Sequence, residues 1–151
     1  MPVPPLLNLS DEADYRRHFD LSYVRGSAVV TPDGIWVRFY PEQFDHAFYD
    51  HAYHGKSSPQ AQRRDTFDFQ RAERMDWLRA VLTDPSVERY RDIRHSKGFW
   101  CVVVEPTTPY VVAFKLMKRQ PPQARFITAF VVDRPWEYLQ KVRRMPTWQL
   151  P

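Results

Sequence analysis

The chain has 151 residues, of which 43% are hydrophobic and 15% aromatic, and its formal net charge is +4. This length suits one sizeable core, so we expect a single domain over residues 1–151 with extended tails at 1–9 and 145–151. MPVPPLL at the start lacks the features of a signal peptide, and no run of about eighteen apolar residues occurs. We therefore expect a soluble, cytoplasmic protein with no membrane partner. The single cysteine, Cys101, cannot form an internal disulfide and is expected to be a buried small hydrophobe.

The basic residues are concentrated toward the C-terminus. Residues 1–110 carry 14 Lys and Arg against 16 Asp and Glu, whereas residues 111–151 carry 8 against 2. A basic part on an otherwise balanced chain favours an anionic partner such as nucleic acid, although such asymmetry serves solubility equally well.

The first elements are predicted by capping and turn residues. Ser10 followed by three acidic residues predicts a helix that begins there and ends near Phe19. The segments Tyr23–Val30 and Ile35–Tyr40 are rich in β-branched and aromatic residues and flank the turn sequence TPDG. They predict an N-terminal β-hairpin.

The stretch FDHAFYDHAYHG follows Pro41 and contains three of the five histidines. We predict a helix over Glu42–His54 that is capped by Gly55, and then a polar loop over residues 56–65. On that helix the apolar face holds Phe44, Ala47, Phe48, His51 and Ala52, and the other holds His46, Tyr49, Asp50 and Tyr53.

A longer helix is predicted over DFQRAERMDWLRAVLTDP, and strands follow it. Asp68 caps this helix, Trp77, Leu78, Val81 and Leu82 form its buried stripe, and Arg71 and Arg74 extend the stripe toward the N-terminus. Strands are predicted over Phe99–Glu105, Tyr110–Met117 and Arg125–Val132, with connections short enough to make them antiparallel. The predicted fold is α+β, with helices packed on an antiparallel sheet of about four to five strands, preceded by the hairpin. Arg134–Arg144 is predicted as a final helix.

The histidine cluster admits several interpretations. Zinc requires three or four ligands, but the spacing here matches no familiar zinc signature and no cysteine accompanies the histidines. His51 lies on the apolar face, where a hydrogen-bonded structural histidine is expected. His46 shares its face with Asp50 and Tyr53, and a histidine held by a carboxylate suits general acid or base catalysis. A solvated histidine with no such role fits the pattern equally well.

The strands supply two further candidates. Alternation in YVVAFKLM places Lys115 at the end of a strand face that is otherwise apolar, with Val111 and Ala113. In RFITAFVVD, Thr128 is an isolated hydroxyl on the predicted face of Phe126 and Phe130. Its hydroxyl suits either an ordinary β-forming residue or a group that binds a phosphate oxygen.

The chain contains no phosphate-binding glycine loop, no nucleophile elbow and no pair of catalytic acids. Histidine, arginine, lysine and threonine remain as the candidates for chemistry. Cleavage of RNA by its own 2′-hydroxyl requires proton transfer and cations that stabilise the charged phosphorane, but no metal. These four residue types meet that requirement.

In order, FDHAFYDH, RAERMDWLRAVLTDP, GFWCVVVE, YVVAFKL and RFITAFVVD resemble the barnase, EndoU, colicin and RelE-like metal-independent ribonucleases of phages, mobile elements and toxin systems. The resemblance runs from about Phe39 to Val132. It implies an endoribonuclease that needs no cofactor and cuts RNA to a 2′,3′-cyclic phosphate. It also implies RNA as substrate and a cognate inhibitor or antitoxin protein as a second partner.

By the same resemblance, the catalytic residues are His46, Arg74, Lys115 and Thr128. Second-tier candidates are His51, His54, Asp50, Tyr53 and Arg71. The chain departs from the family in its hairpin before the first histidine and in its three close histidines, so the base stays open among His46, His51 and His54.

Two alternatives to the ribonuclease hypothesis stay open. One is a non-catalytic module that binds nucleic acid or protein, such as an antitoxin, an immunity protein or a degenerate nuclease. The other is a metal-dependent hydrolase built on the histidine cluster.

Overall fold

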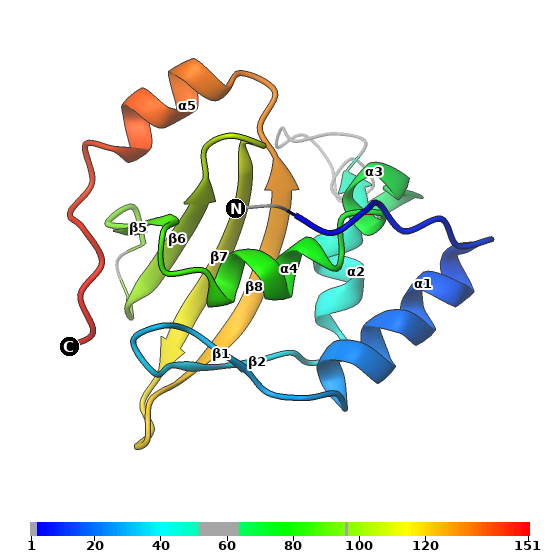
Figure 1. Ribbon diagram of the computed structural model, residues 1–151, viewed down its shortest axis with the longest axis horizontal. Coiled ribbons are helices and arrows are strands. Elements are labelled where there is room, and N and C mark those ends of the chain that lie inside the picture. The colour runs from blue at the N-terminus through cyan, green and yellow to red at the C-terminus, as the bar shows by residue number, and fades with distance from the viewer. Residues whose placement is uncertain (1–2, 52–63, 96) are drawn as a thin grey trace.

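A computed structural model describes residues 3–51, 64–95 and 97–151, and of Asp50, His51, Arg64 and Asp65 it describes the backbone only. Helices pack on a six-stranded sheet, which confirms the predicted α+β class (Figure 1). The helical elements are α1 (Glu12–Phe19), the π-helix η1 (Asp20–Val24), α2 (Gln43–Phe48), α3 (Phe69–Ala72), α4 (Trp77–Thr83) and α5 (Pro135–Val142). The strands are β1 (Val29–Val30), β2 (Trp36–Arg38), β3 (Tyr49–His51), β4 (Arg64–Phe67), β5 (Glu88–Arg91), β6 (Trp100–Glu105), β7 (Tyr110–Met117) and β8 (Gln123–Val131).

The large sheet has the strand order β1-β2-β8-β7-β6-β5, and β3 pairs with β4 separately. All of its neighbours are antiparallel except β2 and β8, which run parallel. The predicted sheet of four to five antiparallel strands is therefore corrected to a mixed sheet of six. The predicted hairpin exists as β1 and β2, but it belongs to the sheet because β2 pairs with β8.

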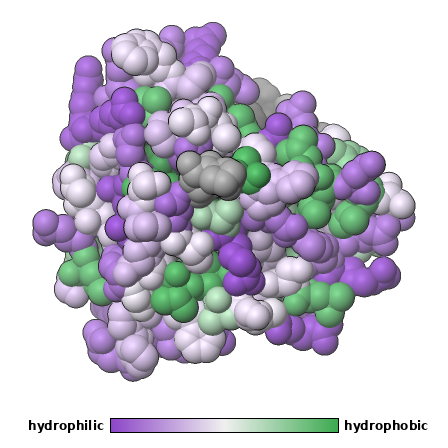
Figure 2. Space-filling model, viewed as in Figure 1, coloured by the Kyte–Doolittle hydropathy of each residue, from purple (hydrophilic) through white to green (hydrophobic). Residues whose placement is uncertain are grey.

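The two faces of the sheet are covered differently. Helices α1 to α4 lie on the inner face, where buried aromatic side chains dominate the main core. In that core the ring centroid of Phe19 lies 5.8 Å from that of Phe44 and 5.7 Å from that of Phe48. A smaller core joins α5 to one end of the other face, which we call the outer face. On the side of the molecule seen in Figure 2, hydrophobic residues form small patches separated by hydrophilic ones.

A β-bulge in β8 decides which side chains reach the outer face. Ala113 pairs with Thr128 and Phe114 pairs with Phe126, so Ile127 is the extra residue. Phe126 packs in the main core on the inner face, and Thr128 follows the bulge and lies on the outer face with Phe130. The expectation that Thr128 shares a face with Phe126 is therefore wrong, because strict alternation does not hold across a bulge.

The predicted helix over Glu42–His54 is also corrected. Helix α2 ends at Phe48, and Tyr49 begins a strand that pairs with β4. Asp50 thus lies in a strand and does not share a helical face with His46. Tyr53 and His54 lie outside the described residues, so their predicted placement stays a prediction.

Other boundaries differ in detail. Asp11 caps α1 instead of Ser10, since its carboxylate accepts a hydrogen bond from the amide of Asp14 at 3.0 Å. Tyr23 lies in η1 and not in a strand. The helix predicted from Asp68 is divided into α3 and α4 by turns at 73–76, although Asp68 caps it and the four-residue stripe is buried as expected.

Both termini are extended and pack against the rest of the chain. The indole Nε1 of Trp77 donates to the carbonyl of Pro4 at 2.8 Å, and the amide of Leu7 donates to the carbonyl of Glu73 at 2.8 Å. Near the other end Trp148 is 6% exposed and belongs to the main core. Among the described residues, every helix is too short or too polar to cross a membrane.

Candidate nucleic-acid interface

Three cations and a tryptophan align across four neighbouring strands of the sheet. Strand register pairs Arg38 of β2 with Arg125 of β8, Arg125 with Lys115 of β7, and Lys115 with Trp100 of β6. Alternation places all four on the outer face, since Val37, Phe114 and Cys101 beside them face the main core. We call this set, Arg38, Arg125, Lys115 and Trp100, the cationic row.

Aromatic rings accompany each cation of the row. The guanidinium carbon of Arg38 lies 4.5 Å from the ring centroid of Trp36, and that of Arg125 lies 5.0 Å from Tyr40. The Lys115 ammonium lies 5.5 Å from the ring centroid of Trp100. These distances are typical of cation–π contacts, which orient long cationic side chains along a surface. Trp36 is 40% exposed, so one large ring of this set meets solvent.

A basic pocket adjoins the cationic row. It has a volume of about 1060 Å³ and lies where the β7–β8 hairpin, the segment before β6 and the C-terminal residues meet. Its lining includes five cations and no aspartate or glutamate: Lys97, Lys115, Lys118, Arg119 and Arg125. Such an arrangement attracts anions and suits phosphate groups. One carboxylate is close to the row, because Glu42 pairs with Arg125 at 3.1 Å; both side chains are exposed, so this pair is weak.

Gly98 fixes the course of the Lys115 side chain. A Cβ atom at Gly98 would lie 2.6 Å from Cε of Lys115, and Gly98 has a φ of +80°. The positive φ favours glycine at this position, and any side chain here would displace the end of the Lys115 side chain. The Lys115 ammonium lies over the ring of Trp100.

A histidine with a carboxylate neighbour borders the same face. The ring of His95 stacks on that of Trp100, with a centroid distance of 3.9 Å and an interplanar angle of 13°. Its Nε2 lies 3.6 Å from Oδ2 of Asp92. Arg94 donates to both Asp92 oxygens, at 2.8 and 2.7 Å, and these hydrogen bonds lower the pKa of Asp92. Asp92 is therefore ionised at neutral pH.

His46 lies on α2 at the flank of β8. With its amide oriented to satisfy both neighbours, Gln43 donates to the carbonyl of Ile127 at 3.1 Å and accepts from Nε of Arg125 at 3.3 Å. One turn further along α2, the carbonyl of Ala47 accepts from Arg71 at 3.3 Å. His46 is exposed, and in the sequence of α2 it lies between the two residues that make these contacts.

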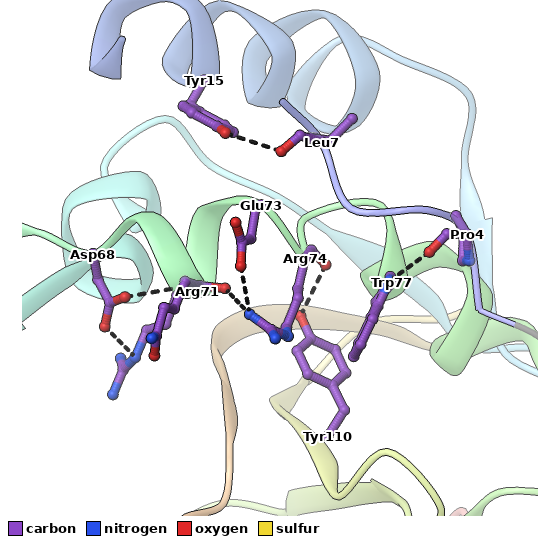
Figure 3. Close-up of polar contacts among 10 residues, drawn as sticks. Pro4, Leu7, Tyr15, Asp68, Arg71, Glu73, Arg74, Trp77 and Tyr110 are labelled. Atoms are coloured by element: carbon purple, nitrogen blue, oxygen red, sulfur yellow. Dashed lines mark hydrogen bonds and ion pairs between the residues drawn. The ribbon is translucent and has the colours of Figure 1, made fainter. Parts of the chain in front are cut away.

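Arg71 and Arg74 have different partners (Figure 3). Arg71 pairs with Asp68 at 3.4 Å, and its guanidinium carbon lies 5.8 Å from the ring centroid of Phe130. Arg74 instead contacts the helix layer over the inner face: it donates to the carbonyl of Gln70 at 2.6 Å and to Glu73 at 3.0 Å.

The structure therefore divides the predicted site residues. Lys115 and Thr128 share the outer face on adjacent strands, about 7 Å apart along the strand direction. Arg71 reaches the edge of this face through Phe130, His46 is exposed on α2, and Arg74 lies apart from the face. For Asp50 and His51 only backbone pairing with β4 is described, and Tyr53 and His54 are outside the described residues.

Several residues of this surface were missed by the sequence analysis. Strand alternation could have found Trp100 and Arg125, which flank the predicted Lys115 once the hairpins are paired. No sequence signal indicates that Arg38 joins them, because a parallel pairing of β2 with β8 depends on the tertiary fold. Nor does the segment that contains His95 have a periodic pattern.

A metal centre finds no support in the described part of the chain. Among the side chains that the structure describes, no three of His, Cys, Asp or Glu form a group that could hold a metal ion. The metal hypothesis for the histidine cluster depends on side chains outside that set, so it stays untested there.

Comparison of the chain with models of protein families, with curated proteins and with solved structures finds no match. The functional argument therefore rests on the residues and geometry of the outer face.

Proposed function

We propose that the chain binds single-stranded RNA across the outer face of its sheet and cleaves it without a metal. The observation that carries this proposal is the cationic row beside a basic pocket whose lining holds no aspartate or glutamate. Cations that follow one direction across a sheet match a phosphate backbone, and exposed rings beside them offer surfaces on which bases stack. Trp36 and the stacked pair of His95 and Trp100 provide such rings.

The reaction that suits this surface is transesterification. The 2′-oxygen of one nucleotide bonds to the adjacent phosphorus while the bond from phosphorus to the 5′-oxygen breaks, which gives a 2′,3′-cyclic phosphate and a 5′-hydroxyl. One proton leaves the 2′-hydroxyl and one is added to the 5′-oxygen. Lys115 stabilises the charge on the phosphorane, and the Thr128 hydroxyl donates to a phosphate oxygen.

Cleavage of single-stranded RNA in the presence of EDTA tests the proposal. The wild-type protein is expected to yield cyclic phosphate ends at a rate that EDTA does not change. Lys115→Gln is expected to reduce that rate about 100-fold, because it removes the cation beside the reacting phosphate. Lys141→Gln, on the exposed side of α5, is the matched control and keeps the wild-type rate. Absence of cleavage by the wild-type protein overturns the proposed reaction.

A second candidate function is RNA binding without cleavage. The position of Arg74 favours it, because this arginine contacts Gln70 and Glu73 and does not join Lys115 on the outer face. Micromolar RNA binding that Lys115→Gln weakens, with no product, would select this alternative.

A further inference from the structure

We propose that His95, supported by Asp92, is the general base that accepts the proton of the 2′-hydroxyl. This inference rests on the proposed function and assigns a residue that the histidine cluster of residues 46–54 did not suggest. It depends on three observations: the position of the His95 ring, the state of its carboxylate neighbour, and the contacts of the other described histidines.

The His95 ring and the cation expected to bind the phosphate contact the same tryptophan. His95 stacks on Trp100 at 3.9 Å, and the Lys115 ammonium lies 5.5 Å from the centroid of the same ring. Trp100 and Lys115 are also paired in strand register. The imidazole and the ammonium thus belong to one cluster around Trp100, and we place the reacting phosphate at this cluster. The His95 side chain is 43% exposed, which leaves part of the ring open to a substrate.

Asp92 is built to stay charged and fixed. It is 5% exposed, and Arg94 binds both of its oxygens through the side chain and one of them through the backbone amide. Its Oδ2 is 3.6 Å from Nε2 of His95, which is longer than a hydrogen bond but within the range of an ion pair with an imidazolium. Asp92 thus places a fixed negative charge beside the ring that accepts the proton. Asp92 is a positioning residue and does not touch the substrate.

The other described histidines are placed differently. His18 pairs with Asp76 at 2.8 Å, between α1 and the turn before α4, in the layer over the inner face. His46 is exposed on α2, whereas Lys115 lies on β7 and its ammonium lies over the ring of Trp100 of β6. His95 stacks directly on Trp100, a member of the cationic row.

The proton balance is complete with one histidine. His95 takes the proton of the 2′-hydroxyl as the 2′-oxygen bonds to phosphorus and the bond to the 5′-oxygen breaks. The leaving oxygen takes a proton from water, and the imidazolium returns its proton to the hydroxide that remains. No oxidant, metal or further reactant is consumed.

The test compares His95→Ala, His46→Ala and His18→Ala with the wild-type protein, using a fluorescent single-stranded RNA. We expect His95→Ala to lose at least 100-fold in single-turnover cleavage rate while its affinity for RNA changes less than about fivefold. Added imidazole should restore part of the lost rate, which a purely structural role for His95 would not allow. His18→Ala is the matched control and keeps the wild-type rate.

The outcomes separate this inference from the proposed function. If the wild-type protein cleaves RNA and His95→Ala cleaves equally fast, or if only His46→Ala loses activity, His95 is not the base. If the wild-type protein does not cleave at all, the proposed function fails. Thermal unfolding of each variant identifies any loss of folding. Asp92→Asn provides a second variant. We expect it to slow cleavage about tenfold, and added imidazole should restore less of its rate than it restores in His95→Ala.

Discussion

Gly98 lies against the side chain of Lys115 in the cationic row. Its φ of +80° suits glycine, and Cε of Lys115 occupies the space that any side chain would need. Gly34 also has a positive φ, +87°, but a Cβ added there would meet nothing within 4 Å. Substitutions at the two glycines therefore distinguish the effect of backbone strain, common to both, from the effect of displacing Lys115, which occurs at Gly98 alone.

We predict that Gly98→Ala and Gly34→Ala each reduce the free energy of unfolding, measured with denaturant, by about 1 kcal/mol through backbone strain. Gly98→Ala alone should also weaken RNA binding, by about tenfold in fluorescence anisotropy, because Lys115 is pushed from its position. Equal RNA affinity of the two variants would mean that the course of the Lys115 side chain does not matter for binding.

The sequence predicted the strand face of Lys115 correctly, but it predicted that of Thr128 only in part. The period of two holds through β7, so the face of Lys115 follows from alternation alone. In β8 the extra residue Ile127 inverts the phase, and nothing in RFITAFVVD marks the position of a bulge. The face of Thr128 therefore depends on pairing with β7 and could not be derived from its own strand.

The C-terminal segment behaves as an additional strand at the edge of β5. The amide of Arg91 donates to the carbonyl of Pro146 at 2.8 Å, and the amide of Trp148 donates to the carbonyl of Arg89 at 3.0 Å. The Trp148 indole donates to Asp33 at 3.1 Å. The residues that follow it, Leu150 and Pro151, line the basic pocket, so Trp148 anchors one wall of that pocket.

We predict that Trp148→Ala lowers the free energy of unfolding by about 3–5 kcal/mol, because it leaves a cavity in the main core and an unpaired Asp33 oxygen. Trp136→Ala is the matched control. Trp136 is 69% exposed on α5, so its replacement should change stability by less than about 0.5 kcal/mol. Chemical denaturation of the three proteins measures both values. Similar losses for the two variants would show that the C-terminal segment does not depend on Trp148.

The elements that the sequence predicted are those with a strong local pattern. The predicted segments agree with strands β6, β7 and β8 and with helix α5. Each of these segments contains its own run of apolar residues and is bounded by turn residues, so the prediction needs no information from the rest of the chain. No strand is predicted at β5, because ERYR has only four residues and gains its strand geometry from pairing with β6. Helix α2 ends early for a related reason: pairing of Tyr49–His51 with β4 competes with helix formation.

In the whole molecule, folding gathers the basic residues of the C-terminal part of the sequence on one surface. Residues 111–151 carry 8 Lys and Arg, and four of them line the basic pocket: Lys115, Lys118, Arg119 and Arg125. The antiparallel β7–β8 hairpin brings these four together, and β2 adds Arg38 from the first third of the chain. The sequence predicts an anionic partner in general terms, but the surface that we propose for it depends on this pairing.

This arrangement makes a quantitative prediction for salt dependence. Each phosphate neutralised on a single strand contributes a slope of about −0.7 to the logarithm of the binding constant against the logarithm of salt concentration. Lys118→Gln with Arg119→Gln, at the rim of the basic pocket, should make the measured slope shallower by about 1.4. The matched control is Arg17→Gln with Arg25→Gln, whose side chains are 69% and 66% exposed in the helix layer over the inner face.

The control also removes two positive charges, but from another surface. It therefore tests whether the position of the charges or the net charge sets the affinity for RNA. If the basic pocket binds phosphates directly, the first pair loses slope and the second pair keeps nearly the wild-type value, since charges more than about 10 Å from the RNA are screened at 0.1 M salt. Titrations at several salt concentrations give both slopes. Equal changes in the two pairs would mean that RNA is attracted by the overall charge of the protein and that the outer face is not its binding surface.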